Sequence, residues 1–189
     1  GVGEAYFGAG GSYSDVAYVT ISTGIGAGIV LGGLLVHGRR SLAEVGHQII
    51  ALDRLHAGQP ATLEELASGS ALARRATAKG IGPYGGDVVA AMRAGNHEAQ
   101  RIWDDVVFAA GVGLVDVAWT FTPEVIVIGG GLGLMGDVLL EPVRRAVHRD
   151  GPPAVQPPID VVAAALGDDA GLAGAAAWHR AFQPEAAGR

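Results

Sequence analysis

A short, wholly apolar segment followed by glycines is the feature that most limits what this sequence can fold into. Val125-Ile126-Val127-Ile128 carries no polar side chain and leads directly into Gly129-Gly130-Gly131. A strand that does not alternate between polar and apolar residues is typical of a parallel sheet covered on both faces. We therefore expect a central parallel strand with the glycines at its carboxyl end, where open α/β sheets bind their ligands.

The segments around this strand predict an α/β arrangement. A long helix is expected from about Glu98 to the residue before Pro123, because apolar residues recur along it alternately four and three positions apart. After the glycines, a helix at Asp137–Arg149, a strand at Ile159–Ala163 and a helix at Ala170–Phe182 follow, as in parallel sheets flanked by helices. The apolar stripe of the long helix comprises Trp103, Val107, Ala110, Leu114, Val117 and Phe121.

The first part of the chain predicts antiparallel strands. Gly3–Tyr6 is interpreted as the end of a helix that the following glycines close. Val16–Ile21 is a β-rich run, and a second run at Gly28–Val36 is interrupted only by Gly32-Gly33, which suits a hairpin. A β-hairpin beside parallel strands is thus the expected sheet.

The middle of the sequence predicts a loop and then one helix. Residues 44–61 are mixed in character, as a loop would be. Thr62, followed three residues later by Glu65, forms a capping box, which predicts a helix from there to about Lys79. The glycines and proline of residues 80–86 would end it.

Composition excludes several classes of function. Among 189 residues, 13 Lys and Arg against 19 Asp and Glu give a net charge of −6, which disfavours binding to nucleic acid or to an anionic membrane. The chain has no cysteine, which excludes disulfides and sulfur-based zinc sites and is compatible with a cytoplasmic setting. No apolar segment reaches the roughly 20 residues of a membrane-spanning helix. We expect one α/β domain over residues 1–189.

Two glycine-rich turns could bind phosphate. Thr23-Gly24-Ile25-Gly26-Ala27-Gly28 has glycines at alternate positions, which lets backbone N–H groups approach an anion. The alternative is a tight hairpin whose glycines serve only positive φ angles. Gly129–Gly131 is the expected place for a nucleotide. Gly131–Gly136 also fits GxGxxG, but a dinucleotide site is disfavoured, because the strand at Ile159–Ala163 ends in alanines and not in an acid that could hold a ribose.

Three polar residues in or beside predicted loops are candidates for binding a sugar. Glu44, His47 and Glu64 carry carboxylates and an imidazole, which make the directional hydrogen bonds that sugar hydroxyls need. Two alternatives stay open: Glu64 could be a first-turn acid favoured by the helix dipole, and His47 a structural histidine. No metal site is predicted, because the other histidines are scattered without ligand spacing: His37, His56, His97, His148 and His179.

Taken together, these segments resemble the signature of the ROK family (repressors, open reading frames, kinases). The order is Ile21, two residues, Gly24-Ile25-Gly26, one residue, Gly28-Ile29, eight residues, Gly38, four residues, Ala43, two residues, Gly46-His47. Residues 63–69, 123–131 and 165–176 also resemble that family, so the resemblance covers nearly the whole chain.

The resemblance implies an actin-like ATPase (ribonuclease H-like) fold in which ATP and a hexose bind between two α/β domains. The chain resembles the large C-terminal domain of a glucokinase-like member, without the small N-terminal domain. The residues that the resemblance assigns to ATP are Thr23, Gly24, Gly26, Gly28, Gly129, Gly130 and Gly131. Those that it assigns to the sugar are Glu44, His47 and Glu64. Homo-oligomers are expected.

The activity that the resemblance implies is ATP-dependent phosphorylation of a hexose, most often glucose, at its 6-hydroxyl. Mg²⁺ would accompany ATP and offset charge on the transferred phosphoryl group. The family's catalytic aspartate lies a few residues ahead of the segment matching Gly3-Glu4, so it would precede Gly1 and the isolated chain is expected to be inactive. Two alternatives remain: the sugar-sensing domain of a transcriptional repressor, and a non-catalytic module.

One departure from the family concerns zinc. Most members have a CxCGxxGC cluster whose cysteines bind a structural zinc together with the histidine that matches His47. Here the cysteine positions correspond to Leu55, Ala57 and Thr62, and only Gly58 is retained. Zinc is therefore not expected, and packing is expected to hold this loop.

Overall fold

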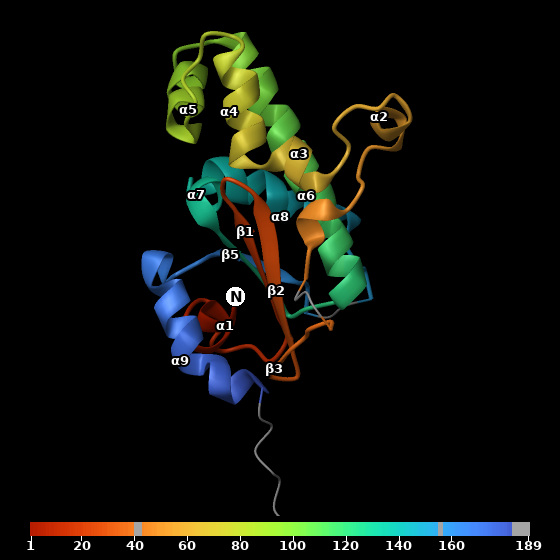
Figure 1. Ribbon diagram of the computed structural model, residues 1–189, viewed down its shortest axis with the longest axis vertical. Helices are drawn as coiled ribbons and strands as arrows, with labels where there is room; N and C mark the ends of the chain where they lie inside the picture. The colour runs from red at the N-terminus through yellow and green to blue at the C-terminus, as the bar shows by residue number, and fades with distance from the viewer. Residues whose placement is uncertain (40–42, 155–156, 183–189) are drawn as a thin grey trace, which may run out of the picture.

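A mixed sheet with helices on both faces organises the structure, a computed structural model that describes residues 1–39, 43–154 and 157–182 (Figure 1). Its five strands lie in the order β3-β2-β1-β4-β5. β1 (Val16–Ile21) pairs antiparallel with β2 (Ile25–Leu31) and parallel with β4 (Val125–Gly129). β3 (Leu34–Leu35) extends the antiparallel side, and β5 (Asp160–Ala163) extends the parallel side. The predicted combination of a hairpin with parallel strands is confirmed.

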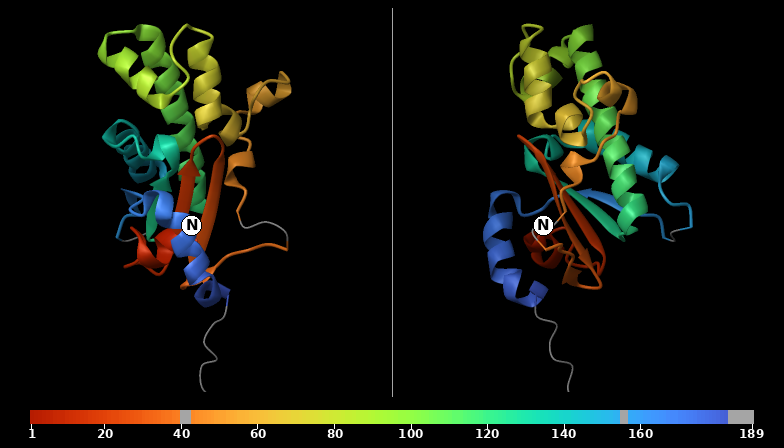
Figure 2. Two further views of the ribbon diagram at one scale, coloured as in Figure 1. Left: turned by 60° about the vertical axis from the view of Figure 1, so that its left-hand side comes forward. Right: turned by 45° about the vertical axis from the view of Figure 1, so that its right-hand side comes forward.

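Two hydrophobic clusters, one on each face of the sheet, form the core. The larger contains alternate residues of β1 from Ala17 to Ile21 and buried residues of α6 (His97–Phe121) and α8 (Asp137–Asp150). The smaller joins the opposite face of the sheet to α1 (Val2–Phe7) and α9 (Ala170–Phe182), which pack against each other (Figure 2). Because both faces are covered, β4 is buried at every residue, as its apolar sequence predicts.

The predicted stripe of the long helix is also confirmed. Trp103, Val107, Ala110, Leu114 and Val117 are buried and Phe121 packs against the same cluster. The glycine turn between β2 and β3 is confirmed too, since Gly32 and Gly33 have φ angles of 56° and 74°. β2, however, begins at Ile25, three residues earlier than expected.

The single helix predicted from Thr62 to Lys79 is wrong. The capping box is present, but it starts a short helix, α3 (Leu63–Ala67), and α4 (Gly69–Thr77) follows after a break. Ser68 is extended at the break and its buried hydroxyl accepts a hydrogen bond from Ala71 N at 3.2 Å, which caps α4. Gly69 N donates to Ser22 O at 2.6 Å, so contact with the β1–β2 turn fixes where α4 begins.

Several short helices lie where loops or glycine turns were expected. α5 (Gly85–Arg93) begins at the glycines that were predicted to end a helix, and Asp87 Oδ2 accepts from Tyr84 N at 3.0 Å at its start. α7 (Gly130–Gly133) follows β4, and the 3₁₀ helices η1 (Val45–His47) and η2 (Gly167–Asp169) complete the elements. Within the described ranges, no helix combines the length and hydrophobicity needed to cross a membrane.

The expectation that packing holds the loop in place of zinc applies only to the base of the loop, where Ala61 is 2% exposed and Ile50 packs against the larger cluster. The loop contains α2 (Leu52–His56), which has no buried residue and projects from the rest of the chain (Figure 1). Backbone pairing also closes the base of the loop, because Ile49 and Thr62 form an isolated β-bridge and Ile50 N donates to Ala61 O at 2.9 Å.

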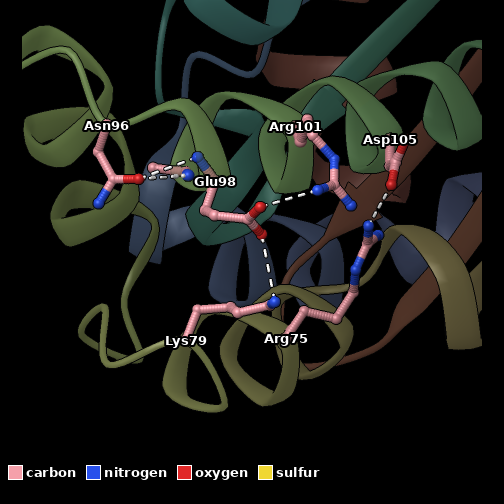
Figure 3. Close-up of polar contacts among 7 residues, drawn as sticks. Arg75, Lys79, Asn96, Glu98, Arg101 and Asp105 are labelled. Atoms are coloured by element: carbon pink, nitrogen blue, oxygen red, sulfur yellow. Dashed lines mark hydrogen bonds and ion pairs between the residues drawn. The ribbon is translucent and has the colours of Figure 1, made fainter.

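Ion pairs join α4 and the turn that follows it to the amino-terminal half of α6 (Figure 3). Arg75 pairs with Asp105, and Lys79 Nζ lies 3.4 Å from Glu98 Oε2. Asn96 caps α6 by accepting a hydrogen bond from Glu98 N at 3.0 Å. Because these side chains are largely exposed, each pair contributes at most about 1 kcal/mol, and the apolar contacts beneath them hold the helices together.

Leu63 offers a test of the packing between α3 and α6. Its side chain is 1% exposed and occupies the space that a Cβ at Gly113 would need. Leu63→Ala is expected to lower the free energy of unfolding by about 2–5 kcal/mol in urea titrations followed by circular dichroism. Leu172→Ala, at a leucine that is 76% exposed, should change it by less than about 0.5 kcal/mol. Equal losses in the two variants would contradict this packing.

Candidate functional site

The pairing of β1 with β4 brings the two glycine-rich turns to one edge of the sheet. Thr20 of β1 lies opposite Gly129 of β4, so the β1–β2 turn and the start of α7 leave the sheet side by side. The carboxyl edge of parallel strands is where α/β proteins bind ligands. The structure therefore places both predicted phosphate-binding turns where a single ligand could contact them.

The glycines after β4 allow close contact with side chains of β1. A Cβ at Gly129 would lie 2.5 Å from the Tyr18 hydroxyl, and one at Gly130 would lie 2.6 Å from Thr20 Oγ1. Gly130 also has a φ angle of 81°. Gly131 is exposed and has open space where its Cβ would be, which leaves room for a ligand beside the turn.

The interpretation that positive φ angles explain the hairpin glycines is wrong. Among the described residues, the glycines with positive φ do not include Gly24, Gly26 or Gly28. Close approach explains two of them, because a Cβ at Gly24 would lie 2.5 Å from Glu64 Oε2 and one at Gly28 would lie 3.1 Å from Gly1 Cα. Around Gly26 the nearest atom to a Cβ would be 3.7 Å away, so this backbone is open to a ligand.

Hydrogen bonds hold the β1–β2 turn in a defined position. Gly69 N donates to Ser22 O at 2.6 Å, and Ile25 N donates to Glu64 Oε2 at 2.8 Å. In the described part of the chain, no hydrogen bond uses the N–H group of Thr23 or Gly24. These two amides, on a rigid turn at the sheet edge, can donate to an anion.

The segments that carry the predicted sugar-binding residues pack against the same hairpin at Ile25. Glu64 is half-buried in the first turn of α3, as the dipole interpretation requires, but its carboxylate also accepts the bond from Ile25 N. Glu44 precedes η1, His47 is the last residue of η1, and both are exposed. Between them, Gly46 packs against Ile25 O so closely that a Cβ would overlap it. Ile25 is therefore the residue at which both predicted sugar-binding segments meet the hairpin.

Tyr18 and Thr20 lie against the glycine turn, so they are further candidate site residues, which the sequence interpretation missed. They alternate with the buried residues of β1, which is the signal that could have revealed them. Burial raises the pKa of the Tyr18 hydroxyl, the charge of Glu4 adds to this, and a hydrogen bond with Thr20 opposes it. Tyr18 therefore presents a protonated hydroxyl to the glycine turn at neutral pH.

The site fits a nucleotide phosphate better than it fits a metal ion alone. The unpaired amides of Thr23 and Gly24 and the open space at Gly26 suit phosphate oxygens. Within the described residues, no group of three or more His, Asp or Glu side chains could hold a metal. A magnesium ion would therefore rely on phosphate oxygens for part of its coordination.

A groove lies elsewhere, between two long helices. It has a volume of about 980 Å³, runs between α6 and α8, and none of the predicted site residues lines it. Asp116 lines this groove, and burial raises the pKa of its carboxyl group.

Asp116 gives a pH-dependent test. Because the pKa of this carboxyl group is raised in the folded state, its protonation contributes to the free energy of unfolding. That contribution is fully present below the unfolded pKa of about 3.9 and is lost as pH rises through the folded pKa. Asp116→Asn should therefore raise the free energy of unfolding at pH 7 and have little effect at pH 3. Asp104→Asn, at an exposed position of the same helix, is the control variant. A loss of stability at pH 7 in the Asp116 variant would contradict the account.

Comparison with known proteins identifies the family. Residues 1–181 match the ROK family. The chain belongs to the ROK family. A glucokinase of Streptomyces coelicolor is 34% identical to it over 96% of this chain and 64% of its own length. The chain thus spans less than two thirds of this ROK relative.

Solved ROK structures match the fold. A ROK family glucokinase from Streptomyces griseus, in complex with glucose and AMPPNP, has a TM-score of 0.78 and 34% identity over 94% of this chain and 64% of that one. The predicted actin-like ATPase fold is therefore confirmed. A ROK family transcriptional regulator, a homologue of the E. coli MLC protein, has a TM-score of 0.79 and 26% identity over 95% of this chain and 49% of that one.

The bond between Glu64 and the hairpin gives a test of this geometry. Glu64→Ala should increase amide hydrogen exchange at Ile25 by about tenfold or more, because the N–H group loses a charged acceptor worth about 1.5–3 kcal/mol. Asp53→Asn, at an exposed acid of α2, is the control and should leave that exchange unchanged. Exchange measured by NMR that stays the same in Glu64→Ala would show that the bond does not form in solution.

Proposed function

We propose that this chain supplies the ATP and hexose contacts of a ROK sugar kinase, with glucose as the favoured substrate and its 6-hydroxyl as the acceptor. The observation that carries the proposal is the junction at Ile25, whose N–H group is held by Glu64 and whose carbonyl packs against Gly46. A kinase needs its phosphate donor and its acceptor held in a fixed relation, because phosphoryl transfer depends mainly on positioning and electrostatics.

Each part of the site has a role in this proposal. The amides of Thr23 and Gly24 donate to the ATP phosphates, and Gly129–Gly131 makes room for the nucleoside beside β1. Mg²⁺, when bound with ATP, offsets charge on the transferred phosphoryl group. These backbone donors need no side chain between them and the ligand, which is why glycine suits the positions.

The sugar is held by Glu44, His47 and Glu64. Glu64 uses Oε2 for Ile25 N, so Oε1 is available to a sugar hydroxyl. One carboxylate would then touch both the hexose and the phosphate-binding turn. The acid–base group is assigned to the aspartate that the family resemblance places ahead of Gly1.

A sugar-sensing role in a ROK regulator is the second candidate function, and the structural match to a ROK regulator favours it. A sensor requires the sugar contacts but has no need of a phosphate-binding turn. The unpaired turn amides of Thr23 and Gly24 therefore support the kinase. Calorimetry that shows glucose binding without any AMPPNP binding would favour the sensor.

Glu44→Gln tests the sugar site. Loss of a charged hydrogen bond to the ligand should weaken glucose binding by about 1–3 kcal/mol, with AMPPNP affinity and the circular dichroism spectrum unchanged. Asp53→Asn should bind glucose as the unmodified chain does, because Asp53 lies on the projecting helix α2. Calorimetry that finds the same glucose affinity in Glu44→Gln would remove Glu44 from the site.

A further inference from the structure

Glu4 is a fully buried acid that the proposed kinase chemistry does not use. Its exposed fraction is 0%, although it lies in the six-residue helix α1. Three backbone N–H groups donate to its carboxylate: Ala9 N to Oε2 at 3.0 Å, Ala165 N to Oε2 at 3.1 Å and Leu166 N to Oε1 at 2.7 Å. Two of these donors belong to the loop that joins β5 to η2.

The surroundings of Glu4 hold its carboxylate in place. A buried carboxylate is costly unless hydrogen bonds replace water, and three charge-assisted bonds do so here. A Cβ at Gly8 would overlap Glu4 Oε2, so the chain passes the carboxylate at a position that only glycine allows. A Cβ at Gly3, on the same helix, would likewise overlap Ala170 O, so α1 packs directly on the start of α9.

The loop that Glu4 holds lies beside the glycine turn of the nucleotide site. β5 runs parallel to β4, so both strands end at the same edge of the sheet. Ala164 N donates to Ile128 O at 2.8 Å, and Ile128 immediately precedes Gly129. The segment Ala164–Leu166 is therefore fixed on one side by β4 and on the other by Glu4.

The sugar side of the site lies on the other face of the sheet. Val45 of η1 and Leu63 of α3 belong to the larger hydrophobic cluster, whereas α1 and α9 belong to the smaller one (Figure 2). The three backbone donors of Glu4 lie after α1 and after β5, and none of them belongs to η1 or α3. This separation distinguishes an effect on nucleotide binding from a general loss of structure.

We propose that Glu4 is a positioning residue of the nucleotide site, an inference that rests on the proposed function. Glu4 is too deeply buried to touch a ligand. It acts through the backbone of Ala165 and Leu166, which it holds next to Gly129–Gly131 so that the start of α9 and the glycine turn enclose the nucleoside part of ATP.

The test compares Glu4→Gln with a matched control, Glu124→Gln. Like Glu4, Glu124 binds backbone amides, since its Oε2 accepts hydrogen bonds from Ser14 N at 2.6 Å and Asp15 N at 3.0 Å. These bonds lie at the amino ends of β1 and β4, away from the glycine turn. Calorimetry with AMPPNP and with glucose is carried out where circular dichroism shows all proteins folded. We expect Glu4→Gln to weaken AMPPNP binding about tenfold or more and glucose binding less than about twofold, with both affinities nearly unchanged in Glu124→Gln.

Each other outcome has a defined meaning. Unchanged AMPPNP affinity in Glu4→Gln, or equal losses for AMPPNP and glucose, would overturn the positioning role while leaving the proposed function intact. Absence of AMPPNP binding in the unmodified chain would overturn the proposed function itself. If Glu4→Gln does not fold, hydrogen exchange of the unmodified chain tests the inference. AMPPNP is expected to slow amide exchange in residues 164–167 and not in residues 14–15. Unchanged exchange in residues 164–167 would overturn the inference.

Discussion

The position of β1 between an antiparallel and a parallel neighbour is the constraint on which the rest of the site depends. The antiparallel neighbour, β2, supplies the hairpin, and the parallel neighbour, β4, supplies the glycine turn. Since Thr20 is opposite Gly129, both turns leave the sheet at one edge. Burial of β4 on both faces fixes this arrangement, because a slip in register by one residue would move its side chains to the opposite hydrophobic cluster.

The hairpin is held from two sides by the segments predicted to bind a sugar. The Glu64 carboxylate accepts a hydrogen bond from Ile25 N, and Gly46 packs on the carbonyl group of Ile25. Gly69 N donates a hydrogen bond to Ser22 O. The glycines of the hairpin serve close approach and access, not positive φ angles. A turn held in this way keeps its unpaired amides in one place, which reduces the reorganisation that a bound phosphate would require.

Much of the fold could be predicted from the sequence, because local periodicity determined it. β1, α6, β4 and α9 follow directly from apolar spacing and from glycine and proline at their ends. The break between α3 and α4 could not be predicted, since it depends on the bond from Gly69 to Ser22. α5 was missed because glycines at its start suggest a turn, and tertiary packing overrides that local preference.

The candidate site was only partly predictable. Its glycines and polar residues stand out in the sequence, but the contact of Glu64 with Ile25 joins residues 39 positions apart. Glu4 was not recognised as a site residue at all, because Ala165 and Leu166, two of its three donors, lie 161 and 162 positions away. Long-range contacts of this kind leave no periodic signal in the sequence, so only the three-dimensional structure reveals them.

The central claim is that one edge of this sheet binds a nucleotide and a hexose side by side. NMR chemical-shift mapping of the uniformly ¹⁵N-labelled chain, titrated with AMPPNP and then with glucose, tests it most directly. The account predicts that AMPPNP shifts the amides of residues 23–28 and 129–131, and that glucose shifts those of residues 44–47 and 64. Shifts confined to the groove between α6 and α8, or no shifts with either ligand, would contradict it.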